Sequence, residues 1–421
     1  MKLEVEVMCS EVIKPSRPTP DHLRKYQLSF LDQISPLVYN PLLLFYANDP
    51  TKQFNSNTLK KSLSDVLTHF YPLAGRLVAN TFVHCNDQGI PFSEARVKCQ
   101  LSQLIQNPLP AQLNHLLPFQ LDNVTDLTFG VQFNVFDCGG VALAACLSHQ
   151  IADALSFFTF LNAWAAVHLA GAPLPIPFPK PHFVSAEIFP PKDISGFDPR
   201  SGITKDNLIC QRFVFDAPVI EALRAKYADT SSSKRPSRVE ALSAFIWSRY
   251  VAVSLSQEPQ RTYAIIHAVN LRPRMEPPLP PNSFGNYYRF VMTIIPSGDG
   301  EGEGVVRQVR EQINKIDKEY VRKLQEGGKE HLDFIKDTSQ RVLVKGEMVS
   351  FSFTSLCRFP LYDADFGWGK PTWVASPALT FKNLVVFIDT KTGAGIEAYI
   401  SLTAEDMAKF QQDAHLLACV N

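Results

Sequence analysis

The sequence has no excess of charge of either sign, because 41 lysines and arginines balance 41 aspartates and glutamates. Nucleic-acid-binding proteins normally carry a basic excess, so no nucleic-acid partner is expected, although a local basic patch can still hold a small polyanion. No apolar run approaches the roughly 18 residues of a membrane-spanning helix. The N-terminus, Met1–Val7, lacks the apolar stretch of a signal peptide. These absences predict a cytoplasmic protein with no membrane partner.

Patterns for metal or covalent chemistry are also missing. The eight cysteines form no C-x-x-C pair, so the sequence indicates neither a zinc site nor a redox motif. No G-x-S-x-G segment occurs and no cysteine stands in a catalytic signature, which disfavours a hydrolase with a serine or cysteine nucleophile. We therefore expect reduced thiols, no bound metal and no permanently bound cofactor.

The chain does have the length and composition of two globular domains. Of its 421 residues, 45% are hydrophobic and 19% are charged, which is typical of a folded protein. Strand-like and helix-like patterns mix in both halves, which indicates an α/β fold. A proline-rich stretch divides the chain, and we predict an N-terminal domain over residues 1–175, a crossover linker over 176–207 and a C-terminal domain over 208–421. We expect a monomer with a ligand cleft between the domains.

Local patterns predict individual elements in the first half. Residues 57–70 have apolar side chains at helical spacing, with Asn57 as the predicted N-cap. Two β-rich runs, 130–136 and 141–147, flank an Asp-Cys-Gly-Gly turn and predict a hairpin. The apolar run 152–170 predicts a deeply buried helix directly after that hairpin.

The second half contains further strand and helix patterns. Ser237 and Glu240 have the spacing of a capping box, which predicts a helix from Ser237 through Tyr250. The charged run 307–329 predicts a helical, solvated face. Other expected elements are strands at 210–215, 263–269, 288–295, 349–353, 384–389 and 395–402, and helices at 218–227 and 404–417.

His149 is the first candidate catalytic residue. It follows an expected strand and precedes the buried helix, so the scaffold would fix it at a corner from which it can reach a cleft. Asp153 comes four residues later and points to the same side if the turn is helical. Taken alone, such an H-x-x-x-D pair is more often a satisfied core histidine than a catalytic group. The small neighbours Ser148, Ala152 and Ala154 leave room for a substrate and favour catalysis.

A second unusual segment is Asp365–Gly369, with the sequence D-F-G-W-G. Gly367 and Gly369 flank Trp368, which predicts a tight loop packed by aromatic rings. Aromatic residues and glycines do not transfer protons, so a rigid brace is favoured over direct chemistry. Asp365 and Arg272 are both candidates for buried ion pairs.

These two segments together resemble the plant BAHD acyltransferases, which carry H-x-x-x-D mid-chain and D-F-G-W-G near the end. Chloramphenicol acetyltransferases and peptide-synthetase condensation domains share the histidine motif, but they usually have glycine where Ala154 stands, and the late D-F-G-W-G favours the plant family. The resemblance covers essentially the whole chain. Segments that resemble the subgroup of vinorine synthase and salutaridinol acetyltransferase are 28–33, 69–76, 136–140 and 268–272.

The resemblance implies two similar domains of the chloramphenicol acetyltransferase type with an active-site tunnel between them. It also implies acyl transfer from acyl-CoA to an acceptor in a ternary complex, with His149 as general base, a role that suits a neutral imidazole. Acetyl-CoA and an alkaloid or terpenoid-like alcohol are the implied substrates. An amine acceptor, a larger acyl-CoA and a catalytically silent binding protein are alternatives.

Supporting roles follow from the same resemblance. In the family, the motif aspartate points away from the histidine and pairs with an arginine, and Asp153 and Arg272 are the matching residues here. Asp365, Gly367 and Trp368 would support the site structurally.

The sequence leaves two interpretations open for the residues that would bind CoA. Lys234, Ser237 and Arg238 stand at an expected helix N-terminus, where phosphate is favoured. A solvated basic loop with an ordinary cap explains them equally well, and only the resemblance favours the phosphates of CoA. Tyr39, Thr354 and Leu356 are candidates for the acceptor pocket.

Leu356 marks a departure from the family pattern. Relatives often have Thr-Ser-Trp at this place, whereas this chain has Thr-Ser-Leu at 354–356. Leucine has no N–H to offer a developing oxyanion, so another donor is needed, such as a backbone N–H or a water molecule. We expect a larger or differently shaped acceptor pocket.

Overall fold

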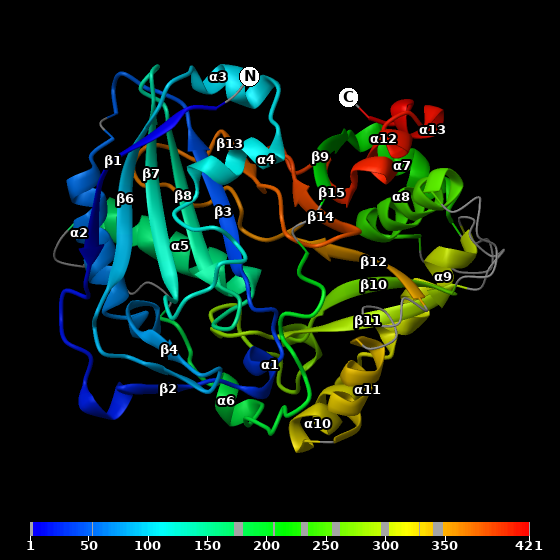
Figure 1. Cartoon of the computed structure of the whole chain (residues 1–421), viewed down its shortest axis with the longest axis horizontal. Coiled ribbons are helices and arrows are strands. Elements are labelled where there is room, and N and C mark those ends of the chain that lie inside the picture. The colour runs from blue at the N-terminus through cyan, green and yellow to red at the C-terminus, as the bar shows by residue number, and fades with distance from the viewer. Residues whose placement is uncertain are drawn as a thin grey trace. The chain divides into compact units, whose positions relative to one another are not determined.

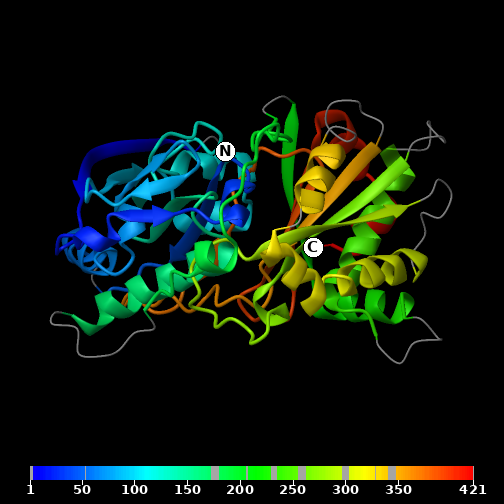
Figure 2. The same cartoon turned by 90° about the horizontal axis from the view of Figure 1, so that it is seen from below.

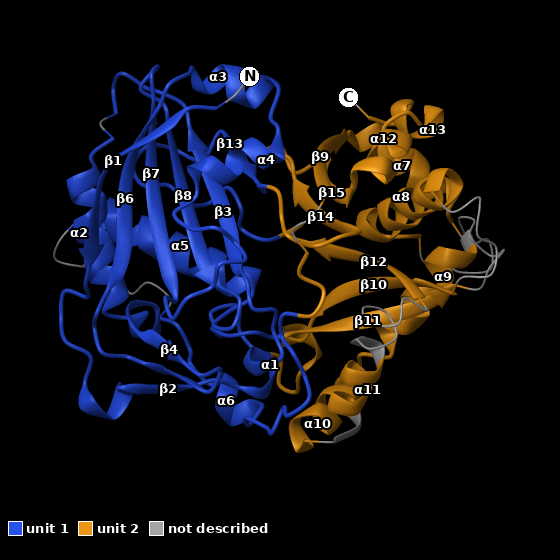
Figure 3. Cartoon of the chain, viewed as in Figure 1, with its two compact units in different colours: residues 1–200, 279–287, 359–377 blue, residues 201–278, 288–358, 378–421 orange. Residues whose placement is uncertain are grey.

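The protein forms two compact units, shown in Figure 3. Segments 279–287 and 359–377 join unit 1 although they lie in the second half of the sequence. Both units mix helices with β-sheet, so the predicted α/β class is confirmed. The expected domains 1–175 and 208–421, with their linker, contain no such exchange and stay a prediction. Unit 1 comprises residues 1–200, 279–287 and 359–377, and unit 2 comprises 201–278, 288–358 and 378–421. The computed structural model describes residues 3–52, 54–171, 180–204, 207–228, 235–254, 262–295, 303–327, 329–339 and 348–420.

Unit 1 is built on a mixed sheet with the strand order β1-β6-β7-β8-β3-β13 (Figure 1). β7 and β8 pair antiparallel on either side of the turn at 137–140, which confirms the predicted hairpin. β13, from the second half of the chain, adds the last strand beside β3. The strands are β1 (Val5–Ile13), β3 (Tyr39–Tyr46), β6 (Ile90–Val97), β7 (Phe129–Phe136), β8 (Val141–Ser148) and β13 (Trp373–Ala375), and a small sheet holds β2 (Lys25–Gln27), β5 (Phe82–His84) and β4 (Arg76–Val78).

Two helices of unit 1 pack against each other, α2 (Ser56–Leu67) and α5 (Ala154–Ala170). The indole N–H of Trp164 on α5 donates to the Leu59 carbonyl on α2 over 3.3 Å. Asn55 caps α2 by accepting from the Asn57 N–H over 2.9 Å, so the prediction of Asn57 as the cap was wrong. Short helices complete the unit: η1 (Asp21–Leu23), α1 (Phe30–Gln33), η2 (Tyr71–Ala74), α3 (Leu101–Gln106), α4 (Pro110–Leu113), η3 (Asn114–Leu116) and α6 (Ser185–Ile188).

Unit 2 has a second mixed sheet, in the order β11-β10-β12-β14-β15-β9. One face packs against α8 (Arg238–Ser254) (Figure 2). Trp247 of α8 contacts the rings of Tyr263 and Phe351 from the strands. β11 and β14 have the bounds that the sequence predicted. The strands are β9 (Leu208–Phe215), β10 (Thr262–Asn270), β11 (Tyr288–Ile295), β12 (Met348–Ser355), β14 (Leu384–Asp389) and β15 (Ile396–Thr403), with helices α7 (Ala217–Lys226), η4 (Arg272–Arg274), α12 (Ala404–Phe410) and α13 (Ala414–Leu417).

The charged run predicted to be helical is divided into α9 (Glu303–Asn314), α10 (Lys318–Glu326) and the start of α11 (Lys329–Ser339). Asp317 causes the first break, because its carboxylate accepts from the Tyr320 N–H over 2.8 Å and caps α10. No helix in the described ranges is long and apolar enough to cross a membrane.

Candidate active site

His149 stands immediately after β8, where the sheet of unit 1 gives way to α5. Its N–H donates to the Val38 carbonyl over 2.9 Å, and the next turn closes through the Ile151 N–H and the Ser148 carbonyl over 3.0 Å. The side chain is half-buried. Burial lowers the pKa of His149 and the nearby Asp153 carboxylate opposes that shift. The imidazole is therefore kept neutral near pH 7, as a general base requires.

Asp153 is the N-cap of α5 and lies outside the helix. One carboxylate oxygen accepts from the Ser156 N–H over 3.0 Å, and the other accepts from the Tyr287 N–H over 3.0 Å. The Asp153 N–H in turn donates to the Gly285 carbonyl over 3.2 Å. This carboxylate thus holds the segment 285–287 against the start of α5. The turn from His149 to Asp153 is not helical, so the condition under which the two side chains would point to the same side is not met.

Asn286 is a site residue that the sequence reasoning missed. Its side-chain amide donates to the His149 carbonyl over 2.7 Å and to the Asp32 carboxylate over 2.9 Å. Gly285, at φ +145°, precedes it, and a Cβ there would lie 2.9 Å from the Cβ of Ser185. The Gly-Asn pair was the available signal, but its partners are too distant in sequence to be inferred.

Segment Asp365–Gly369 has the local form of a brace. The Asp365 carboxylate accepts from the N–H groups of Gly367 and Gly369, each over 2.8 Å, and both glycines have positive φ, 81° and 86°. Trp368 packs edge-on against Tyr46, with ring centroids 5.3 Å apart. The expected buried ion pair of Asp365 is not found within the described ranges. The two backbone N–H groups donate to its carboxylate instead.

Two of the candidate CoA-binding residues already have partners within unit 2. Ser237 forms the predicted capping box: its N–H donates to Glu240 over 2.7 Å and its hydroxyl accepts from the Glu240 N–H over 3.2 Å. Arg238 donates to Asp389 over 2.8 Å and to the Gly393 carbonyl over 2.8 Å. Lys234 lies outside the described residues.

The remaining candidates are placed as follows. Arg272, in unit 2, is 3% exposed, and its N–H donates to the Asn270 side chain over 3.1 Å. Thr354 and Leu356 lie at the end of β12 and are half-buried, and the Leu356 N–H donates to the Phe387 carbonyl over 2.8 Å. Tyr39, in unit 1, is 1% exposed, and its hydroxyl meets the Thr125 hydroxyl at 3.1 Å.

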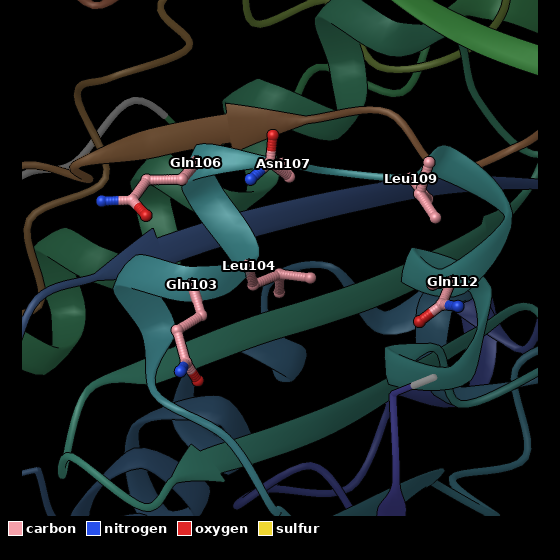
Figure 4. A pocket seen from close by; sticks show the side chains of 6 residues that line it. All are labelled: Gln103, Leu104, Gln106, Asn107, Leu109 and Gln112. Carbon is pink, nitrogen blue, oxygen red and sulfur yellow. The ribbon is translucent and has the colours of Figure 1, made fainter. Parts of the chain in front are cut away.

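One small cavity of about 270 Å³ opens beside α3 and α4 (Figure 4). α3 follows β6, so the cavity lies near the end of β6. That end, Val97, pairs with Phe136 at the end of β7, which is the end of the sheet where β8 begins. His149 follows the opposite end of β8, so this cavity is not its substrate site. The lining residues are Gln103, Leu104, Gln106, Asn107, Leu109 and Gln112. Within the described part of the chain, no cluster of three His, Cys, Asp or Glu residues could hold a metal ion.

The family model called Transferase family matches residues 3–417. This chain belongs to that family, the BAHD acyltransferases. Stemmadenine O-acetyltransferase of Catharanthus roseus is 37% identical over 98% of this chain and 97% of its own length. Vinorine synthase of Rauvolfia serpentina is 36% identical over 97% and 96%. The predicted family and its vinorine synthase-like subgroup are thereby confirmed.

Solved structures agree with this assignment. The crystal structure of vinorine synthase matches with a TM-score of 0.85 at 36% identity and covers 99% of both chains. F. graminearum TRI101, complexed with coenzyme A and T-2 mycotoxin, matches with a TM-score of 0.75 at 19% identity over 94% of this chain and 99% of its own. This second likeness shows the fold alone.

Proposed function

We propose that this BAHD enzyme transfers an acetyl group from acetyl-CoA to a hydroxyl of an alkaloid or terpenoid-like plant metabolite, with His149 as general base. The observation that carries the proposal is the position of His149. It stands at the end of β8, its main chain is held from both sides, and burial keeps its imidazole neutral. CoA-dependent O-acyl transfer to specialised metabolites agrees with the family and with the named activities of its relatives.

The proposed reaction needs one proton carrier. The acceptor hydroxyl gives its proton to the His149 imidazole while its oxygen attacks the thioester carbonyl carbon. The tetrahedral intermediate then collapses, the C–S bond breaks, and the CoA thiolate leaves and takes the proton from the imidazolium. A positioned base of this kind contributes about 10²- to 10⁴-fold to the rate.

The names of relatives support the substrate class. Stemmadenine O-acetyltransferase and limonoid 21-O-acetyltransferase, the latter of Melia azedarach and 36% identical over 99% of this chain, are both named for acetyl transfer to oxygen. These names favour an acetyl donor and an alcohol acceptor over a larger acyl-CoA or an amine. We keep Asp153–Arg272 as the proposed ion pair of the catalytic turn and Tyr39, Thr354 and Leu356 as proposed acceptor contacts.

Other parts of the proposal rest on the sequence. Lys234, Ser237 and Arg238 stay candidate contacts for the CoA phosphates. Arg238 already donates to Asp389. A contact between Arg238 and CoA would therefore either add to this hydrogen bond or break it. The interdomain tunnel, the monomeric state and the cytoplasmic location are likewise predictions from the sequence.

The experiment is release of free CoA thiol from acetyl-CoA over a panel of alcohol acceptors, for wild type and His149→Ala. We expect the variant to lose about 10²- to 10⁴-fold in kcat. His22→Ala is the control, since His22 is exposed on η1. Wild-type turnover in His149→Ala would overturn the mechanism. Faster release of CoA thiol with amine acceptors, or with longer acyl-CoA donors, would show that the proposed substrate class is wrong. Binding of CoA without any turnover would identify a catalytically silent binding protein.

A further inference from the structure

Asp32 is a fully buried carboxylate that the proposed reaction does not use. One oxygen accepts from the N–H and hydroxyl of Ser29, over 2.8 and 2.7 Å. The other accepts from the N–H and side-chain amide of Asn286, over 3.0 and 2.9 Å. The groups that donate to this carboxylate in the described ranges are all neutral. A buried charge is costly, and capping the four-residue helix α1 does not require one.

The contact with Asn286 leads directly to His149. The side-chain amide of Asn286 has two protons, of which one goes to Asp32 and the other to the His149 carbonyl over 2.7 Å. If this amide flipped, its oxygen would face two acceptors, the Asp32 carboxylate and the His149 carbonyl. An ionised carboxylate at position 32 therefore fixes the orientation in which Asn286 can hold the main chain of His149.

We propose that ionised Asp32 is a positioning residue for the acyl-transfer reaction, acting on His149 through Asn286. The inference rests on the proposed function of His149. Protonation of Asp32 would put an O–H where an acceptor is needed, so Asn286 or Ser29 would lose its partner. The imidazole would then be less well placed, and a misplacement of about 1 Å can reduce a rate by about 100-fold.

The titration of Asp32 falls in an accessible range. Burial raises the pKa of Asp32 to about 6, and the donors Ser29 and Asn286 oppose that rise. The other groups near it are Ser185 of α6, whose hydroxyl lies 3.4 Å away, and Tyr26 of β2, which bonds to Ser185 over 3.2 Å. Burial raises the pKa of Tyr26 well above its usual value, so Tyr26 does not change charge in this range. On the α5 side lie Asp153 and His149, of which His149 titrates as the base itself. Lys192 also packs against α1, with its Nζ 4.1 Å from the centroid of the Phe30 ring.

The first measurement is the pH dependence of kcat for the wild-type protein. Two groups, His149 and Asp32, must both lose their protons, so kcat should fall on the acid side more steeply than a single-proton curve, or in two steps. Ser29→Ala removes a donor to the Asp32 anion, which raises the pKa of Asp32 and moves its step to higher pH. Asp32→Asn should lose about 10- to 100-fold in kcat with little change in KM, and its acid limb should follow one proton.

A matched control exists in the same unit. Asp87 accepts from the N–H and hydroxyl of Thr19, over 2.9 and 2.6 Å, much as Asp32 accepts from Ser29. Within the described residues, Asp87 has no hydrogen bond to His149 or Asn286. Asp87→Asn should keep the wild-type kcat and pH profile. Circular dichroism at each pH checks that every variant stays folded. If Asp32→Asn fails to fold, the wild-type and Ser29→Ala profiles still decide.

The outcomes separate the two proposals. A single-proton acid limb in wild type together with an unmoved limb in Ser29→Ala would overturn the role of Asp32, as would wild-type kcat in folded Asp32→Asn. Absence of CoA release by wild type over the whole acceptor panel would instead overturn the proposed function.

Discussion

Helices α5 and α8 both begin at a polar cap, but the two caps reach different distances along the chain. At α5, Asp153 bonds the Ser156 N–H within the helix and the Tyr287 N–H from a segment 134 residues away. At α8, Ser237 and Glu240 cap each other's backbone, and the Glu240 carboxylate also accepts from Arg310 of α9, 70 residues away, over 3.0 Å. The α5 cap therefore fixes a segment that also contacts His149 through Asn286, whereas the bonds of the α8 cap lie within unit 2.

The largest effect is expected at the α5 cap. Asp153→Ala removes the cap and leaves the buried Tyr287 N–H without its acceptor, so unfolding free energy should fall by about 2–4 kcal/mol. Because segment 285–287 also holds the His149 carbonyl, kcat should fall as well. Asp317→Ala is the control, since it removes an aspartate cap that bonds only the Tyr320 N–H of its own helix. Urea unfolding and CoA release measure both variants, and equal losses from both would mean that the longer reach of Asp153 has no consequence.

A smaller effect is expected at the α8 cap. Ser237→Ala removes the acceptor of the Glu240 N–H and should lower the unfolding free energy by about 1 kcal/mol, with kcat unchanged. If Ser237 also contacts the CoA phosphates, KM for acetyl-CoA should rise several-fold. Thr403→Ala tests the distinction, because Thr403 caps α12 through the Asp406 N–H over 3.1 Å. A KM that stays unchanged in both variants would leave Ser237 as an ordinary cap.

The same contrast explains what the sequence could predict. Adjacent residues determine the β7–β8 hairpin, the Ser237–Glu240 box and the bounds of β11 and β14, and all were read correctly. Asn286 was missed because its role depends on hydrogen bonds to His149, 137 residues away, and to Asp32, 254 residues away. The N-cap of α2 was misplaced because Asn55 and Asn57 are both good caps by composition, and only the backbone decides which N–H groups lie in the first turn.

The smallest effect on stability is expected at Leu356, which follows β12 and is half-buried. Its backbone N–H already bonds the Phe387 carbonyl at the end of β12, and this contact survives any side-chain change. Leu356→Trp restores the ring that BAHD relatives often carry, so we expect it to alter the ratio of kcat/KM between small and large acceptors while KM for acetyl-CoA stays constant. Leu356→Met, which keeps a similar volume, is the control and should preserve the acceptor ratio. An unchanged ratio in Leu356→Trp would show that position 356 does not shape the acceptor pocket, and the preference of this enzyme would then have to come from other residues, with Thr354 the next to test.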